Sequence, residues 1–247
     1  PEALTRLINR LLTALSDVIA EQHGTIDKYI GDCVMAFWNA PLPQVDHARR
    51  AVVASLAMLE TMDQLNADLQ AEGQTQAAEF TPLKVGIGVN TGAVVVGNMG
   101  SDRRFDYTVM GDAVNLSSRL EGISKLYRVS IVISEATRGG VEDYATIELD
   151  SIVVAGRDTP VRVYTVLGPP SVAMDPDFRR LETLNARMLL AYRGQDWAEA
   201  ACLAEQCKAL DDGRLAGFYE LYQTRISDLR RNPPPPGWSG FYVATTK

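Results

Sequence analysis

The chain has 247 residues, of which 46% are hydrophobic and 22% are charged, and its formal net charge is −7. This length provides for one well-formed core and an appended module, whereas the acidic balance excludes extensive electrostatic binding to nucleic acid. The three cysteines, Cys33, Cys202 and Cys207, match neither a zinc pattern nor an even disulfide framework, so a reducing, cytoplasmic setting is expected.

The N-terminal segment predicts a helix followed by a hairpin. Apolar side chains recur every three or four residues over 4–19, which predicts an amphipathic helix that ends by Gly24. Residues 25–38 read as two short strands joined at Gly31 and Asp32, a dipeptide suited to the positive φ of a tight turn. Polar side chains at this turn are therefore expected on a hairpin.

The next segment predicts a second helix and a second hairpin. Apolar residues at helical spacing over 48–65 predict a long helix, which a polar loop over 73–79 ends. Apolar and other residues alternate over 83–89, and a turn at Thr91 leads into a β-rich run at 93–96. These two runs are expected to pair with each other.

A strand, a helix and further strands are predicted up to residue 166. The strand ends at about Met110 and the helix follows, with Asp112 as its N-cap. β-rich runs come next at 130–133, 144–154 and 161–166. The corner between the strand and the helix is well placed to meet a ligand.

Gly168 and the two prolines after it predict a domain boundary. Beyond it, helices are predicted over 178–193, 197–210 and 215–230, before a four-proline run at 233–236. Within it, YRGQDWAEAACLAEQCKAL has the aromatic and small-residue layout of one helical-repeat hairpin. A single repeat cannot form an independent solenoid, so this extension is expected to pack on the main domain.

Two blocks of sequence carry a family resemblance: DKYIGDCVMAFW and YTVMGDAVNLSSRLEG, with LKVGIGVNTGAVVVGNMG between them. Together they resemble the catalytic domains of class III adenylate and guanylate cyclases. The resemblance implies an α+β fold with a ferredoxin-like antiparallel sheet and flanking helices. It assigns residues 1–168 to a catalytic domain without its first strand, and 169–247 to a helical extension with a proline-rich segment and a strand-like tail.

The resemblance also implies site residues, beginning with Asp32, which stands where the family holds a catalytic magnesium. A hard divalent ion prefers carboxylate oxygens and can bridge substrate phosphates. Mg²⁺ or Mn²⁺ is therefore the expected cofactor, with two ions per active site in the intact family. The alternative is that Gly-Asp is simply a common turn.

Lys28 and Thr108 occupy the two purine-selecting positions of the family. An ammonium group only donates hydrogen bonds, so it satisfies N1 of adenine but not the N1–H of guanine, and a threonine hydroxyl can accept from the adenine amine. The pair resembles the subgroup of these cyclases that responds to bicarbonate. Taken singly, each residue is also an ordinary strand residue.

Asn115 and Arg119 lie four residues apart on the predicted helix, so their side chains share a face. The resemblance makes Asn115 the residue that orients the ribose and Arg119 the cation on the transition state, where a guanidinium can donate to two phosphoryl oxygens. The alternative for Arg119 is a surface ion pair, which is common and weakly stabilising.

Two departures from the family pattern stand out. The Asp-Ile and Phe-Thr signature of the family's first strand, which supplies the other metal aspartate, has no counterpart in the chain, so these residues alone are expected to be inactive. Where relatives place a triphosphate-binding lysine, this sequence has Ala155, and Arg157 is the candidate to replace it.

The implied reaction is attack of the ribose 3′-oxygen on the α-phosphorus of ATP under two metal ions, releasing pyrophosphate. The active site is expected to be shared across a homodimer, with Lys28, Asp32 and Thr108 from one chain and Asn115 and Arg119 from the other. A catalytically silent regulatory module remains an alternative, and so does a guanylate cyclase, which Lys28 disfavours.

The tail PPPPGWSGFYVATTK resembles the ends of bacterial cyclases whose N-terminal half is a membrane-bound sensor. An upstream sensor domain in the same polypeptide is therefore expected. The 247-residue chain would then be the cytoplasmic domain of a membrane-anchored parent protein. No run reaches the roughly 18 apolar residues of a membrane helix, so an anchor is expected elsewhere. ATP and a second copy of the chain are the expected partners, and bicarbonate is a candidate activator.

Overall fold

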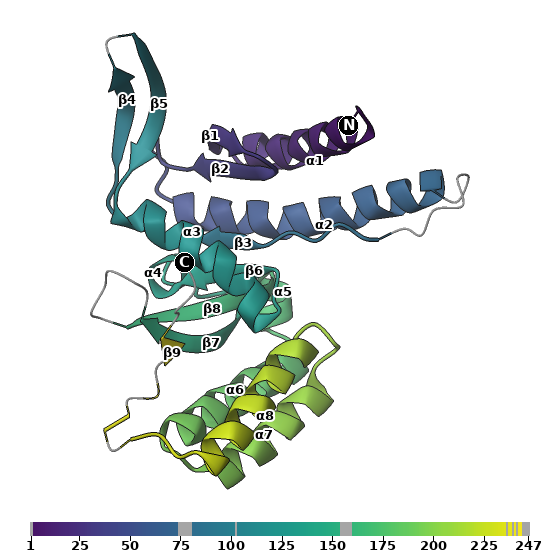
Figure 1. Cartoon of the computed structure of the whole chain (residues 1–247), viewed down its shortest axis with the longest axis vertical. Helices are drawn as coiled ribbons and strands as arrows, with labels where there is room; N and C mark the ends of the chain where they lie inside the picture. Colours follow the sequence, from purple (N-terminus) through teal and green to yellow (C-terminus); the bar gives the residue numbers. More distant parts are fainter. Residues whose placement is uncertain are drawn as a thin grey trace. The chain divides into compact units, whose positions relative to one another are not determined.

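The computed structural model describes residues 2–73, 81–101, 103–153, 160–235, 237–238, 240 and 242–243 (Figure 1). The chain divides into two compact units, and each is built from discontinuous segments. The first unit comprises Pro1–Val85 and Thr91–Asn115, and the second comprises Gly86–Asn90 and Leu116–Lys247.

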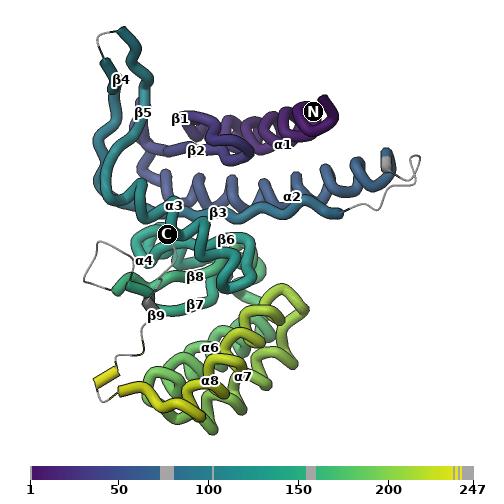
Figure 2. Tube along the Cα trace, in the orientation of Figure 1, coloured from purple at the N-terminus to yellow at the C-terminus, as the bar shows by residue number. Residues whose placement is uncertain are grey.

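The described residues of the first unit form helices α1 and α2 and two antiparallel hairpins. Helices α1 and α2 contact each other, β1 pairs with β2, and β4 pairs with β5 from Val95↔Met110 to Ser101↔Arg104. Figure 2 shows β4 and β5 as one extended arm. The elements are α1 (Glu2–Glu21), β1 (Thr25–Ile30), β2 (Cys33–Phe37), α2 (His47–Gly73), β4 (Val95–Ser101) and β5 (Arg104–Met110).

Helix α1 ends where the chain turns into the first hairpin. His23 adopts a positive φ of 57°, and Gly24 N donates to Ile19 O at 2.8 Å. A β-carbon on Gly24 would lie 2.6 Å from Ile19 Cγ2 and 2.8 Å from the Trp38 ring, closer than packed atoms can approach. Gly24 therefore permits the close packing of Ile19 and Trp38 against the backbone, whereas His23 adopts the left-handed conformation of the turn.

The second unit is built on a five-stranded sheet in the order β3-β6-β8-β7-β9. β8 is antiparallel to both neighbours, β6 and β7, while β3 and β9 add as parallel edge strands. The mixed α+β content with antiparallel sheets and flanking helices confirms the predicted fold class. The strands are β3 (Ile87–Val89), β6 (Ile131–Ser134), β7 (Ala145–Val153), β8 (Val161–Gly168) and β9 (Tyr242–Val243), and the helices are α4 (Glu135–Arg138), α5 (Pro170–Ala173), α6 (Pro176–Arg193), α7 (Trp197–Leu210) and α8 (Ala216–Arg231).

Helix α3 (Asp112–Tyr127) follows β5 directly, as predicted. Asp112 is its first residue rather than its N-cap, which shifts the predicted boundary by one position. Leu116 and Leu120 are buried, whereas Asn115 and Arg119 are exposed. The sequence thus identified both the helix and its apolar face.

The predicted pairing of residues 83–89 with 93–96 is wrong. The strand over Ile87–Val89 pairs in parallel with β6, and β4 pairs with β5 instead. Alternation of apolar residues predicts a strand but does not identify the strand it pairs with. The turn at Thr91 favoured a local hairpin, whereas the actual partner of β3 lies more than 40 residues further along the chain. The predicted loop over 73–79 lies outside the described residues except for Gly73, which still belongs to α2.

The C-terminal helices pack on the sheet as predicted. Side chains of α3, β6, β7 and β8 share one buried apolar cluster with α6, α7 and α8. Tyr222 donates to the carbonyl of Leu149 at 2.7 Å, and Asn185 donates to the carbonyl of Glu148 at 2.9 Å. The helical extension is therefore part of the core of the second unit.

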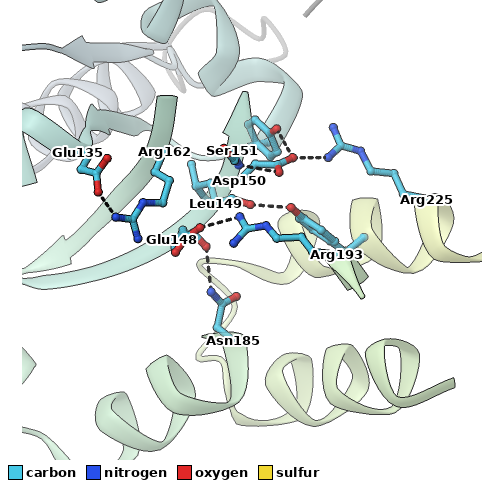
Figure 3. A network of polar contacts seen from close by, with 11 residues as sticks. Glu135, Glu148, Leu149, Asp150, Ser151, Arg162, Asn185, Arg193 and Arg225 are labelled. Atoms are coloured by element: carbon cyan, nitrogen blue, oxygen red, sulfur yellow. Dashed lines mark hydrogen bonds and ion pairs between the residues drawn. The ribbon is translucent and has the colours of Figure 1, made fainter. Parts of the chain in front are cut away.

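Charged groups join β7 to these helices (Figure 3). Asp150 Oδ2 accepts from Tyr127 at 2.7 Å and from Arg225 Nη1 at 3.0 Å, and Glu148 pairs with Arg193 at 2.6 Å. Burial raises the pKa of Asp150, although the hydrogen bond from Tyr127 and the charge of Arg225 oppose the rise. In the described ranges, no helix is long and apolar enough to cross a membrane.

Candidate functional site

A polar cluster joins β1 to β5 in the first unit. Lys28 Nζ donates to Thr108 Oγ1 at 3.2 Å, although the two residues are 80 positions apart in the chain. Thr108 in turn donates its hydroxyl proton to Asp27 Oδ2 at 2.6 Å, because an ionised carboxylate can only accept. The structure thus brings together the two residues expected to select the purine, and adds a third that the sequence analysis did not single out.

A β-bulge places Asp27 and Lys28 in the same cluster. Ile26 lies opposite Ala36, and Lys28 lies opposite Met35, so two steps along β1 match one step along β2. Consecutive strand residues normally point to opposite faces, and a bulge re-aims a side chain. Both neighbours can therefore contact Thr108.

Burial and charge divide the cluster into a hidden and an accessible part. The side chain of Asp27 is fully buried, Thr108 is 8% exposed, and the side chain of Lys28 is 44% exposed. Asp27 Oδ1 lies 3.3 Å from Lys28 Nζ, an ion pair without hydrogen-bond geometry, while Oδ2 also accepts from Val109 N at 3.3 Å. A ligand would therefore meet the ammonium of Lys28 from solvent, with the carboxylate behind it.

Asp32 lies in the two-residue turn between β1 and β2, as predicted. Ile30 pairs with Cys33 across this turn, and Gly31 has a φ of 66°, a conformation in which glycine avoids steric strain. Asp32 is exposed. Its carboxylate fits one ligand position of Mg²⁺, an ion that is often held by one or two carboxylates with water and substrate phosphates.

No group of three or more metal-ligating side chains occurs within the part of the chain that the structure describes. The remaining predicted residues lie away from the hairpin in the sequence. Asn115 and Arg119 are one turn apart on α3 and both are exposed. Ala155 and Arg157 lie outside the described residues.

Comparisons with known proteins cover the first two thirds of the chain. The family described as adenylate and guanylate cyclase catalytic domain matches residues 1–168. Adenylate cyclase 1 of Rhizobium meliloti is 34% identical over 169 residues, which make up 68% of this chain and 24% of that protein. The adenylate cyclase of Anabaena cylindrica is 34% identical over 170 residues, which make up 67% of this chain and 32% of that protein. The chain therefore spans at most a third of these relatives.

Two solved structures show the same fold over the same part of the chain. The adenylyl cyclase CyaB from P. aeruginosa has a TM-score of 0.61 and 38% identity, covering 68% of this chain and 83% of that one. The guanylyl cyclase Cya2 has a TM-score of 0.59 and 33% identity, covering 68% and 82%. Relatives of both nucleotide specificities are thus similar to this chain.

Proposed function

Because this chain belongs to the adenylate and guanylate cyclase catalytic domain family, we propose that a polypeptide extended upstream of it converts ATP to 3′,5′-cyclic AMP and pyrophosphate. Adenylate cyclases stand among its relatives and its structural neighbours, and both substrates occur in the family. The choice between ATP and GTP therefore has to come from residues of the chain itself.

The contact between Lys28 and Thr108 is the observation that favours ATP over GTP as the substrate. The 3.2 Å hydrogen bond places a donor and an acceptor side by side on β1 and β5. Adenine offers an acceptor at N1 and a donor at its 6-amino group, which is the complementary pair. Guanine offers the reverse pair, a donor at N1 and an acceptor at O6. A site that leaves buried polar groups unpaired against the wrong base rejects it strongly.

The metal-dependent part of the proposal rests on Asp32. The exposed carboxylate of Asp32, on the turn between β1 and β2, would hold one of two Mg²⁺ or Mn²⁺ ions. Divalent ions, when bound, polarise the α-phosphoryl group and favour the ionised 3′-oxygen. Lys28 and Thr108 hold the purine, and so limit the positions that the ribose can reach.

Residues of α3 supply the remaining groups. Asn115 would hydrogen-bond the ribose, and Arg119 would donate to the non-bridging oxygens of the α-phosphate as charge develops there. Both are exposed on one face of α3, which suits groups that meet a ligand. Arg157 would bind the triphosphate in place of the lysine that Ala155 replaces.

A homodimer with shared active sites completes the proposal. The hairpins of the first unit expose large apolar side chains, among them Val95 at 67% and Phe105 at 64%. Exposed apolar patches mark interaction sites in soluble proteins, and a second copy of this chain is the partner that we propose for these side chains. Lys28, Asp32 and Thr108 would then come from one chain, and Asn115 and Arg119 from the other. The wider exposed set is Tyr29, Ile30, Val94, Val95, Phe105, Tyr107 and Met110.

Regulation by other parts of a longer polypeptide also belongs to the proposal. The relatives are three to four times longer than the matched region, which leaves room for a sensor domain beside the cyclase domain. The Lys28 and Thr108 pair further suggests the bicarbonate-responsive subgroup. We place the catalytic domain in the cytoplasm, with residues 1–168 as the catalytic part and 169–247 as an extension of its core.

Turnover of ATP and GTP tests the proposed function. Cyclic AMP and cyclic GMP should be measured with Mg²⁺ or Mn²⁺, with and without bicarbonate, for these 247 residues and for a version extended upstream. Cyclic AMP from the extended version, with little cyclic GMP, is the expected result. No cyclic nucleotide from either version would instead identify a silent nucleotide-binding or dimerisation module, and a predominance of cyclic GMP would identify a guanylate cyclase.

A further inference from the structure

We propose that Asp27 is the residue that makes this site specific for adenine, by fixing the direction of the Thr108 hydroxyl group. The inference rests on the proposed function, because it assigns the purine to Lys28 and Thr108. It adds Asp27 as a positioning residue, whose side chain is fully buried and which the bulge in β1 places beside Thr108.

Asp27 uses up the only proton of the Thr108 hydroxyl. The 2.6 Å contact to Oδ2 must run from Thr108 to the carboxylate, since an ionised carboxylate has no proton to give. The same carboxylate oxygen accepts from Val109 N, which holds it against β5. The hydroxyl proton therefore has a fixed direction, toward Asp27 Oδ2.

The hydroxyl oxygen is left with acceptor capacity only. Of its two lone pairs, one accepts from Lys28 Nζ at 3.2 Å, so one remains for a ligand. The ammonium has three hydrogens, and within the described part of the chain its hydrogen bond to Thr108 uses one of them, while Asp27 pairs with its charge. An ammonium donor and a hydroxyl acceptor are thus available side by side.

A threonine hydroxyl that could rotate would not discriminate between the two purines. It can donate to O6 of guanine as readily as it accepts from the amine of adenine, because a free hydroxyl both donates and accepts. With its proton held by Asp27, it can only accept, so guanine would place its O6 acceptor against another acceptor. The charge of Asp27 also holds Lys28 beside Thr108 rather than extended into solvent.

The experiment compares nucleotide discrimination in Asp27→Asn and unmodified protein. An asparagine can turn its amide NH₂ toward Thr108 and so release the hydroxyl proton. We expect the ratio of the Kd values for non-cyclisable GTP and ATP analogues, measured by calorimetry, to fall about tenfold or more. The same fall is expected in the ratio of kcat/KM values wherever turnover is measurable.

Two further variants separate positioning from a general structural effect. Asp106→Asn removes an exposed carboxylate from β5 that pairs with Arg104, and should leave the ratio unchanged. In a Thr108→Val background, Asp27→Asn should have no further effect on the ratio, because the hydroxyl through which Asp27 acts is gone. A purely structural role would lower both affinities together and add to the effect of Thr108→Val.

An unchanged ratio in Asp27→Asn would overturn the inference while leaving the proposed function intact. If unmodified protein shows adenine preference in binding but never forms cyclic AMP, the proposed function fails and the role of Asp27 in recognition stands. Should the variant not fold, NMR of the unmodified protein provides the test. A hydroxyl proton held by a buried carboxylate exchanges slowly with water, so a Thr108 hydroxyl that exchanges too fast to observe contradicts the proposal.

Discussion

Asp150 and Arg225 form a buried ion pair at the junction of β7 and α8 (Figure 3). The side chain of Asp150 is 1% exposed and that of Arg225 is 12% exposed. Arg225 also lies over the rings of Tyr127 and Tyr222, at 5.2 and 5.5 Å from their centres. A charge removed from water in this way depends on its partner, because no solvent can replace it.

Arg225→Met should therefore destabilise the protein strongly. Leaving the carboxylate of Asp150 buried and unpaired is expected to lower the free energy of unfolding by about 3–5 kcal/mol, measured by urea denaturation at neutral pH. The deficit should shrink in acid, where Asp150 takes up a proton and carries no charge. Burial already raises the pKa of Asp150, and losing Arg225 removes a charge that opposes the rise.

Two variants serve as controls for this prediction. Arg162→Met breaks an exposed pair with Glu135, and should cost about 1 kcal/mol or less. Asp150→Asn combined with Arg225→Met should recover much of the loss, since no charge is then left unpaired. Equal losses for Arg225→Met and Arg162→Met would show that burial of the pair contributes nothing.

At the scale of single residues, the sequence predicted Lys28, Asp32 and Thr108 by family resemblance, and the structure places them on one hairpin and the strand next to it. Asp27 was missed for a physical reason. Alternation in a strand puts Asp27 and Lys28 on opposite faces, and a bulge is not visible in the spacing of apolar residues. The neighbouring acidic residue carried no signal until the register was known.

At the scale of elements, α7 matches its predicted bounds and α6 and α8 differ from theirs by one or two residues. Amphipathic spacing over several turns identifies such helices because one face is buried along the whole length. Pairing of strands is a different matter. The edge strand β3 pairs with β6, which lies far along the chain, and the local sequence around β3 does not identify so distant a partner.

The buried face of α7 makes one thiol unreactive. Burial raises the pKa of Cys207 to about 12, whereas Cys33 and Cys202 are exposed. We expect a thiol reagent at about pH 8 to label Cys33 and Cys202 in the native protein, and all three cysteines in denaturant. Folding keeps the Cys207 thiol protonated to a higher pH than unfolding does. Its contribution to the free energy of unfolding is therefore complete below the unfolded-state pKa of Cys207, and it is lost as the pH rises toward 12.

Substitution by serine checks the assignment of the labelled thiols. Cys202→Ser should remove one label from the native protein, whereas Cys207→Ser should change only the denatured count. Rapid labelling of Cys207 in the native protein would show that α7 detaches from the core on the time scale of the reaction.

At the scale of the whole molecule, shared active sites predict complementation between inactive chains. Asp32→Ala and Arg119→Ala, made in the same active polypeptide, should each abolish turnover. Mixed and re-equilibrated, they should recover about a quarter of the unmodified rate, since about half of the dimers are mixed and each mixed dimer has one intact site of two. Cyclic AMP formation at fixed total protein measures the recovery.

The matched control pairs two changes on the same side of the site. Lys28→Ala mixed with Asp32→Ala should recover nothing, because every site then contains one altered residue. Proven heterodimers of Asp32→Ala and Arg119→Ala without recovery would refute the shared site, as would full activity in a monomer.

The two compact units interleave along the chain, and this limits how the protein can be divided. Residues 86–90 leave the first unit to supply β3 of the second, and the chain then returns to the first unit until Asn115. A single cut therefore cannot produce two self-sufficient fragments. A cut before Ile87 separates the two segments of the first unit, and a cut between Val89 and Ile131 separates β3 from the rest of its sheet. Mutagenesis and fusion designs should accordingly keep the region from α1 to α8 together, because α6, α7 and α8 also belong to the core of the second unit.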